Sequence, residues 1–227
     1  KNIQNLFRKL SFFPFIGILT IASYRIDIIM VNYLTNYENT AIYSIASRIT
    51  LAISTFYFVL IRFLYPTISN KIKNTQYIEK IFKRVIGITF IFTIIIFSFF
   101  LFFGDYLLII FGTFYLKSKS ILLTLIINLM FIIILELSIN HKYIKNNYYE
   151  IIKISVFYIF MNLTLNYLFI INYGFYFASI ATLISGLITV IFFHKKEINY
   201  KNISFYFSTR NWIDIKTVVI KNILKKK

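Results

Sequence analysis

The sequence predicts an all-α integral membrane protein with six transmembrane helices. Of the 227 residues, 59% are hydrophobic and only 15% are charged. Soluble domains are nearer half apolar and about a quarter charged. The mean hydropathy of +0.73 agrees with a chain that is embedded in lipid. The apolar residues form long continuous runs, whereas β-barrel strands would alternate in polarity over about ten residues.

Six apolar runs are long enough to cross a bilayer, which takes about 20 predominantly apolar residues. In chain order they are Leu10–Leu34, Ala41–Ser69, Val85–Phe111, Ser120–His141, Ile151–Ile171 and Phe175–Phe193. The connections between them are short and polar or contain glycine. No stretch has the composition of a soluble domain, so residues 1–194 are expected to form one transmembrane unit.

The distribution of positive charge predicts the orientation, since loops rich in Lys and Arg stay on the cytoplasmic side. With a cytoplasmic N-terminus, the segments on that side carry 20 of the 25 Lys and Arg residues. The opposite side carries Lys117 and Lys119, and Arg25, Arg48 and Arg62 lie within apolar runs. Both ends are therefore expected to be cytoplasmic. Because the charges lie between the runs and not along one face, a nucleic-acid-binding surface is not predicted.

Two amphipathic segments are expected to lie along the cytoplasmic interface. In the first, Ile78, Ile81, Phe82 and Val85 recur at helical spacing opposite charged residues. The second is the basic tail, residues 195–227, which combines many lysines with apolar side chains. Anchoring to anionic lipid is the expected role of both, and partner binding is the alternative.

The first run carries two charged residues, Arg25 and Asp27, near its middle. Each would cost about 2.5 to 3.5 kcal/mol at the centre of a transmembrane helix, so such residues usually face a partner, a water-filled cavity or a substrate route. Two residues apart, they point to roughly opposite sides. Asp27 and Arg48 lie at similar depth, so a structural ion pair between them is one prediction. Arg25 is left as a candidate site for an anionic head group such as diphosphate.

Two further charged residues lie near the cytoplasmic ends of their runs. Arg62 can place its guanidinium at the interface by extending its long stem. Glu136 cannot do so as well, and it is expected either to pair with Arg62 or to titrate, with a proton-coupling role as one possibility.

Polar and small residues form stripes on the last two runs. Ser155, Tyr158, Asn162 and Asn166 follow three- and four-residue steps on one helical face. They either bond neighbouring helices or line a cavity for hydroxyl-rich sugars, and the sequence leaves both open. On the sixth run a face of small residues predicts close helix packing; it consists of Ala178, Thr182, Ser185, Gly186 and Thr189.

Signals for catalysis or cofactors are weak. The chain has no cysteine, which excludes disulfides, cysteine metal sites and thiol catalysis. The two histidines lie at the ends of apolar runs and cannot form a metal site alone. No glycine-rich phosphate loop occurs. We therefore predict no catalytic residue, no metal and no cofactor, and a protein that is not an enzyme.

Several motifs together resemble the C-terminal half of bacterial polysaccharide repeat-unit flippases, the O-antigen and capsule (lipopolysaccharide) translocases of the multidrug/oligosaccharidyl-lipid/polysaccharide exporter superfamily. They include Arg25-Ile-Asp27-Ile-Ile-Met30, and a segment ending in Arg48 that is similar to the family's G-x-Y-x-x-A-x-R. The others are Leu64-Tyr65-Pro66, Asn162-Leu-Thr-Leu-Asn166 and the stretch Tyr173 to Thr182. The chain departs from the family in having Ala41 and Phe177 where glycine is usual.

The resemblance implies one six-helix lobe of a two-lobe transporter of about twelve helices in the bacterial inner membrane. Such proteins move undecaprenyl-diphosphate-linked oligosaccharides to the periplasmic leaflet by alternating access, for surface polysaccharide biosynthesis. The implied partners are this lipid-linked substrate, membrane lipid and an N-terminal lobe of the same protein. Arg25 and Arg48 would hold the diphosphate, Asn162 and Asn166 would meet the glycan, and Asp27 would orient Arg48.

Two alternatives belong to other functional classes. A multidrug cation antiporter of the same superfamily would favour acidic residues in its cavity, and here arginines outnumber them. A membrane glycan polymerase or acyltransferase would need a sizeable extramembrane loop with catalytic residues. The predicted outside loops are too short for that.

Overall fold

The computed structural model describes residues 14–70 and 75–194, and all regular structure in these two ranges is helical. A first helix, Pro14–Ser23, is followed by α2 (Ile26–Leu34), α3 (Tyr37–Asn70) and α4 (Thr75–Ile109). A short 3-10 helix, η1 (Thr113–Ser118), leads into α5 (Lys119–Ile144), α6 (Tyr148–Tyr173) and α7 (Phe177–His194). The predicted all-α class is confirmed for these residues. The predicted tail helix in residues 195–227 lies outside them.

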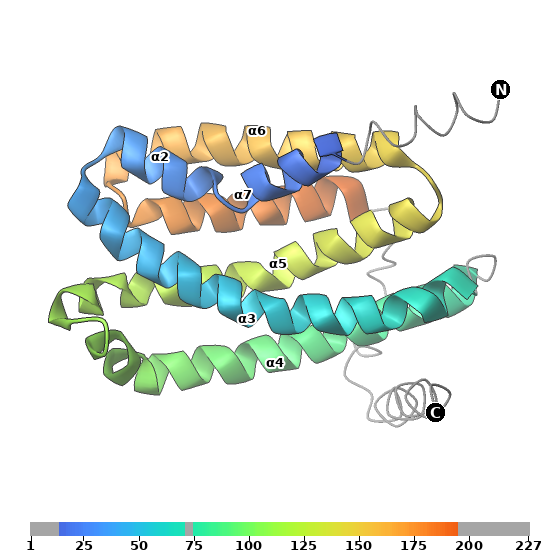
Figure 1. The fold of residues 1–227 in the computed structure, drawn as a ribbon, viewed down its shortest axis with the longest axis horizontal. Coiled ribbons are helices and arrows are strands. Elements are labelled where there is room, and N and C mark those ends of the chain that lie inside the picture. Colours follow the sequence, from blue (N-terminus) through green and yellow to red (C-terminus); the bar gives the residue numbers. More distant parts are fainter. Residues whose placement is uncertain (1–13, 71–74, 195–227) are drawn as a thin grey trace.

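The helices run back and forth along one long axis (Figure 1). The α2–α3, α4–α5 and α6–α7 connections lie at one end, and the α5–α6 turn lies at the other. Helix α5 occupies the centre, because it packs against α3, α4, α6 and α7. Helix α2 contacts both α3 and α6. This arrangement brings the first helix and α2 over the inner face of α5 and α6.

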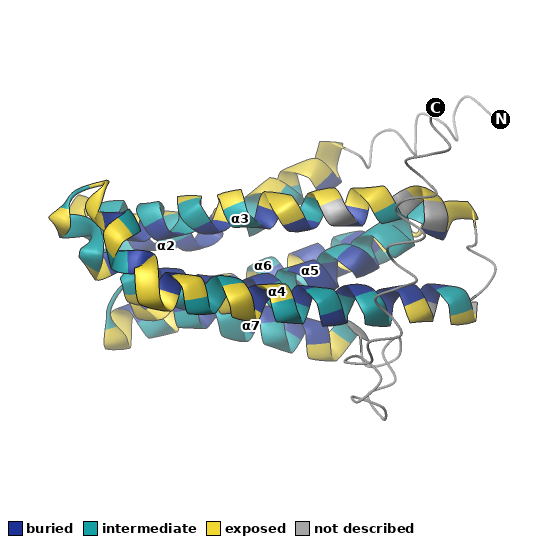
Figure 2. Cartoon of the chain, turned by 90° about the horizontal axis from the view of Figure 1, so that it is seen from below, coloured by how far each residue is buried: buried dark blue, intermediate teal, exposed yellow. Residues whose placement is uncertain are grey.

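The central position of α5 follows from its sequence. Its buried apolar residues are spread around the helix and contact partners on several sides; they include Ile121, Leu122, Ile126, Leu129, Ile133 and Leu137. A helix that is apolar all round is buried in protein or in lipid. Exposed large hydrophobic side chains instead follow the outward faces of the other helices (Figure 2), among them Phe56, Phe102, Phe160 and Phe192. Such a surface is suited to contact with lipid.

The number of membrane crossings differs from the prediction. Four segments are each long and apolar enough to span a bilayer: α3, α4, η1 with α5, and α6. The first helix and α2 meet the same test only as a pair bent by 53°, which gives up to five. The apolar stretch of α7, Phe177–Phe193, is shorter. Within the described residues each of the six predicted runs is mainly helical, but six crossings are not confirmed.

The segment that was predicted to lie along the interface belongs to a longer helix. Ile78, Ile81, Phe82 and Val85 form the first turns of α4 and are buried against α3 and α5. The amphipathic pattern was recognised correctly, but its apolar face covers neighbouring helices. The prediction of a separate surface helix is therefore wrong. The same spacing of apolar residues arises whether the apolar face packs against protein or against lipid.

The two ends of the bundle differ in charge. The end with the α5–α6 turn and the start of α4 carries Lys80, Lys83, Arg84, Lys142, Lys145 and Lys153. At the opposite end, Lys119 donates to Asp105 at 2.6 Å, and Lys117 lies over the ring of Phe114 at 5.1 Å. The described residues thus gather most of the positive charge at one end, as the loop count predicts.

The face of small residues on α7 packs closely, which confirms that prediction. Ala178, Ser185 and Thr189 are fully buried. Gly186 has the tightest surroundings, since a Cβ atom placed there would lie 2.8 Å from Asn128 Oδ1 and 3.3 Å from Phe131 Cβ of α5. Small side chains at such crossings let transmembrane helices approach each other.

We expect Gly186→Ala to lower the stability of the protein by about 1 to 3 kcal/mol, because the added methyl group overpacks the α5–α7 contact. Gly104→Ala is the matched control, since a Cβ atom there meets nothing nearer than 3.7 Å. Thermal unfolding of both variants in detergent measures the difference. Equal unfolding temperatures would contradict the close contact.

Candidate functional site

The candidate site is built around the break between the first helix and α2. The first helix ends at Ser23, Tyr24 and Arg25 form a turn, and α2 starts at Ile26. Around the turn, Arg25 N–H bonds to the Ala22 carbonyl at 3.1 Å, three residues back. The Ser23 hydroxyl donates to the Leu19 carbonyl at 2.7 Å, a back-bond of the kind that bends helices. The break contains neither proline nor glycine.

The break separates the two charges, as their spacing predicts. Asp27 is buried, with 6% of its surface exposed, whereas Arg25 is exposed. The Asp27 carboxylate accepts the Tyr43 hydroxyl at 2.8 Å and the Ile28 N–H at 2.9 Å. Within the described residues, the Arg25 guanidinium has neither a hydrogen bond nor an ion pair.

The predicted ion pair between Asp27 and Arg48 is not formed. Arg48 is exposed on α3, and Tyr43, five residues earlier, takes the position beside the carboxylate. On a helix, five residues correspond to more than one full turn, so the two side chains point in different directions. The depth estimate placed α3 correctly beside Asp27 but selected the wrong residue on it.

Arg48 instead lies on an exposed stripe of α3. Arg48, Thr55 and Arg62 follow one another at intervals of seven residues, which places them on the same side of the helix, and all three are exposed. Ser47, next to Arg48, lines the same hollow as Arg25. Two of the arginines that were predicted within apolar runs therefore share one face of α3.

A hollow with mainly apolar walls and several polar groups lies beneath Arg25, between the helix break and α3, α5, α6 and α7. We call it the Arg25 pocket. Its polar lining residues are Ser23, Tyr24, Arg25, Asp27, Ser47, Thr50, Ser54, Asn128, Tyr158 and Thr182. They come from six helical segments that only the tertiary structure brings together.

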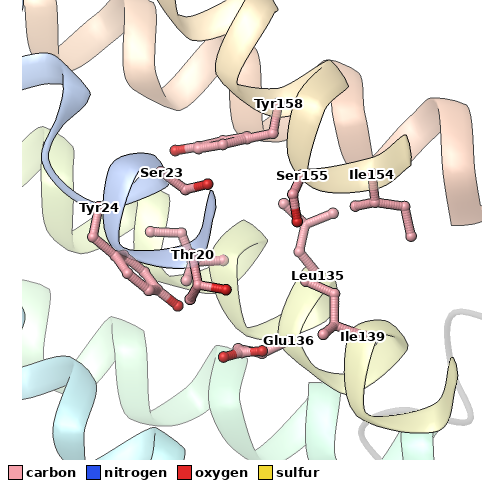
Figure 3. A pocket seen from close by; sticks show the side chains of 10 residues that line it. Thr20, Ser23, Tyr24, Leu135, Glu136, Ile139, Ile154, Ser155 and Tyr158 are labelled. Atoms are coloured by element: carbon pink, nitrogen blue, oxygen red, sulfur yellow. The ribbon is translucent and has the colours of Figure 1, made fainter. Parts of the chain in front are cut away.

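A second hollow lies on the other side of the break, between the first helix, α5 and α6. We call it the Glu136 pocket (Figure 3). Ile132, Leu135, Ile139 and Ile154 give it a largely apolar wall. The Tyr24 hydroxyl lies against the Glu136 carboxylate. Tyr24 also contacts Phe58 of α3 edge-to-face, with the two ring centroids 5.9 Å apart.

The two pockets are neighbours with a common wall. Ser23, Tyr24, Ile132 and Tyr158 line both. Each pocket contains one carboxylate, Asp27 in the first and Glu136 in the second. Tyr24, at the helix break, therefore stands between two acidic positions.

The predicted pairing of Glu136 with Arg62 is not a direct contact. No ion pair joins these two residues, although both lie in the described part of the chain, and Arg62 is exposed. The direct neighbour of Glu136 is Tyr24, a residue that sequence reasoning did not select.

The polar stripe on α6 divides between two roles. Ser155 and Tyr158 line the pockets, so this half of the stripe faces a hollow. Asn162 and Asn166 have no exposed surface. Asn162 Nδ2 donates to the Ser185 hydroxyl at 3.2 Å, and Asn166 Nδ2 donates to Asn162 Oδ1 at 2.7 Å.

Asn162 and Asn166 therefore bond α6 internally and to α7, and neither lines a pocket. Their predicted contact with a glycan is wrong for this conformation, because fully buried amides have no surface to offer a ligand. The alternative prediction for the stripe, bonding between neighbouring helices, describes these two residues.

Sequence reasoning missed Tyr24, Tyr43 and Asn128 as parts of the site. A tyrosine in an apolar run gives little signal by itself, since it also suits the membrane interface. A buried carboxylate needs hydrogen-bond donors. Only the three-dimensional structure shows which donors lie near Asp27.

The described residues contain no group of three or more His, Asp or Glu side chains that could hold a metal ion. The pockets combine a few polar and charged side chains with largely apolar walls, within a bundle that has an apolar exterior. Comparisons of the chain with protein-family models, curated proteins and solved structures give no match.

We expect Tyr43→Phe to destabilise the protein by about 1 to 2 kcal/mol, because it leaves a buried carboxylate without its hydroxyl donor. Tyr57→Phe is the control, since Tyr57 is also buried and its hydroxyl lies 3.1 Å from Thr93 Oγ1, a neutral partner. We expect a smaller loss there, about 0.5 to 1 kcal/mol.

A double-mutant cycle tests the assigned contact. In an Asp27→Asn background, Tyr43→Phe should cost measurably less than in the wild type, because contacting residues are not additive. Thermal unfolding in detergent supplies the energies. Strict additivity would show that the two side chains do not interact.

Proposed function

We propose that the chain is one lobe of a membrane transporter that flips lipid-linked, diphosphate-bearing oligosaccharides across the bacterial inner membrane. The proposal combines the motif resemblance with one structural observation. Arg25 is an exposed arginine without a partner in the described residues, and it stands at the helix break beside a pocket that contains several polar side chains.

The position of Arg25 supports this proposal physically. Broken transmembrane helices near the middle of the bilayer are a recurrent way to build substrate sites in transporters. A diphosphate group loses its hydration when it leaves water, and a guanidinium can replace that hydration with paired, charge-assisted hydrogen bonds. Arg48 is exposed near the same pocket and supplies a second positive charge.

The residues then take the following roles. Arg25 and Arg48 hold the diphosphate, and Asp27, bonded to Tyr43, fixes the start of α2 and hence the position of Arg25. The exposed stripe of α3 with Arg48, Thr55 and Arg62 faces a second, N-terminal lobe across a central cavity. Alternation between two arrangements of the lobes carries the head group from the cytoplasmic to the periplasmic leaflet, and the basic end of the bundle is cytoplasmic.

A second candidate, a multidrug cation antiporter, is favoured by a different observation. Both pockets contain a carboxylate, Asp27 or Glu136, and the Glu136 pocket has the apolar wall that a lipophilic cation prefers. This candidate explains the acidic residues, whereas the flippase explains the exposed arginines.

The decisive experiment follows labelled lipid-linked oligosaccharide to the periplasmic leaflet in cells that carry the whole protein. We expect Arg25→Ala to reduce delivery at least about 100-fold, and Arg25→Lys to restore only part of it, because an ammonium lacks the paired donors of a guanidinium. Lys153→Ala, at the basic end, is the control with the same change in charge and should leave delivery unchanged.

Normal delivery of the lipid-linked oligosaccharide by the Arg25→Ala variant would contradict the flippase proposal. The antiporter candidate makes the opposite prediction. Efflux of a lipophilic cation would fall in Glu136→Gln and remain in Arg25→Ala.

A further inference from the structure

The α2 side of the helix break is held by a side chain that takes over a backbone bond. The Ile28 N–H donates to Asp27 Oδ1 at 2.9 Å. In a continuous helix this N–H would donate to the Tyr24 carbonyl, four residues back. The Asp27 carboxylate therefore replaces a bond that would otherwise carry the helix across the turn.

The other side of the break is held by Tyr24, which contacts two neighbouring helices. Its ring meets Phe58 of α3 edge-to-face, with the centroids 5.9 Å apart. Its hydroxyl lies against the Glu136 carboxylate of α5 (Figure 3). A tyrosine has an apolar ring and a polar tip, so both parts can find a partner at once. Tyr24 therefore attaches the turn to α3 through its ring and to α5 through its hydroxyl.

The end of the first helix next to the turn is exposed on one side and borders a hollow on the other. Ile18 and Ile21 expose 65% and 67% of their surface. Thr20 and Ser23 line the Glu136 pocket, and their hydroxyls donate to carbonyls of the same helix at 2.8 and 2.7 Å. These two protons are used within the first helix. Tyr24 is then the side chain that ties this end of the helix to α3 and α5.

We propose that Tyr24 is a positioning residue for Arg25. Tyr24 directly precedes Arg25 in the turn, so the direction in which its side chain is held also sets the direction of the next residue. Asp27, bonded to Tyr43, fixes the turn from the α2 side. For its biological use this inference rests on the proposed function, but the position of the break can be measured without transport.

Spin labels can report the position of the break, because the chain has no cysteine and introduced cysteines are labelled selectively. One label replaces the exposed Phe15 of the first helix, and the other replaces the exposed Tyr149 of α6 or, in a second sample, Phe63 of α3. At about 1.5 Å per residue, a change of about 15° in the 53° bend moves Phe15 by about 3 to 4 Å. Pulsed electron resonance on the whole purified protein, with any other cysteine replaced by serine, measures both distances.

We expect Tyr24→Phe to shift the mean distance by at least about 3 Å in one or both label pairs, because the first helix loses its attachment to α5. Glu136→Leu should give the same shift, and the double variant no more, since both changes break one contact. Glu136→Gln keeps an acceptor oxygen and should leave the distances near the wild type. The control is Tyr57→Phe, which removes a hydroxyl 3.1 Å from Thr93 Oγ1 and away from the break.

Delivery of labelled lipid-linked oligosaccharide tests whether Tyr24 acts through Arg25. We expect Tyr24→Phe to lower delivery at least about tenfold, because a functional group must be held closely in place. In an Arg25→Ala background the same change should not lower the residual delivery further, since no guanidinium is left to position. A merely structural tyrosine would lower delivery by the same factor in both backgrounds.

Two results would overturn the inference: both distances stay unchanged in Tyr24→Phe and in Glu136→Leu, or Tyr24→Phe lowers delivery as strongly without the Arg25 guanidinium as with it. If the distances stay unchanged while delivery depends on Arg25, the flippase proposal stands without this role for Tyr24. If the distances shift while delivery is independent of Arg25, Tyr24 still positions the turn and the flippase proposal falls.

Discussion

The hydrogen bond between Asp27 and Tyr43 is the constraint on which the candidate site depends. A carboxylate inside a bundle with an apolar exterior is costly unless donors face it, and Tyr43 supplies one at 2.8 Å. The bond ties the first turn of α2 to α3. Because Arg25 precedes Asp27 by two residues, the inward direction of the carboxylate forces the guanidinium outward, to the mouth of the pocket.

The same requirement explains how the remaining polar groups are distributed. Asn162 donates to Ser185 and accepts from Asn166 in the contact between α6 and α7, whereas Asn166 Oδ1 is buried without a hydrogen bond. Small residues of α7 allow this contact and the approach to α5. Tyr158, on the same stripe of α6, lies one turn nearer the α5–α6 end and reaches the pockets. One polar stripe therefore contributes both to helix packing and to the site.

The two pockets lie on either side of one helix break and differ in their charged residues. One contains an exposed arginine and a buried aspartate, and the other contains a glutamate, while both have largely apolar walls. Tyr24 separates them and also contacts Phe58 of α3. A movement of the break would therefore change both pockets together.

For the described residues, the sequence by itself determined the all-α class, the mainly helical character of the six apolar runs, the concentration of positive charge at one end and the close packing of the small face around Ser185 and Gly186. These features can be predicted because they depend on the composition and periodicity of single stretches of the sequence. The sequence also separated Arg25 from Asp27, because two residues on a helix point to nearly opposite sides.

Only the tertiary structure decided which residues meet. The structure shows that Tyr43, and not Arg48, is the partner of Asp27, and that Tyr24 lies beside Glu136. It also buried Asn162 and Asn166 and joined residues 78–85 to α4. Depth along a helix can be estimated from rise per residue, but the direction of a side chain depends on helix rotation and on the 53° bend. Those are set by contacts between helices that no single stretch of sequence contains.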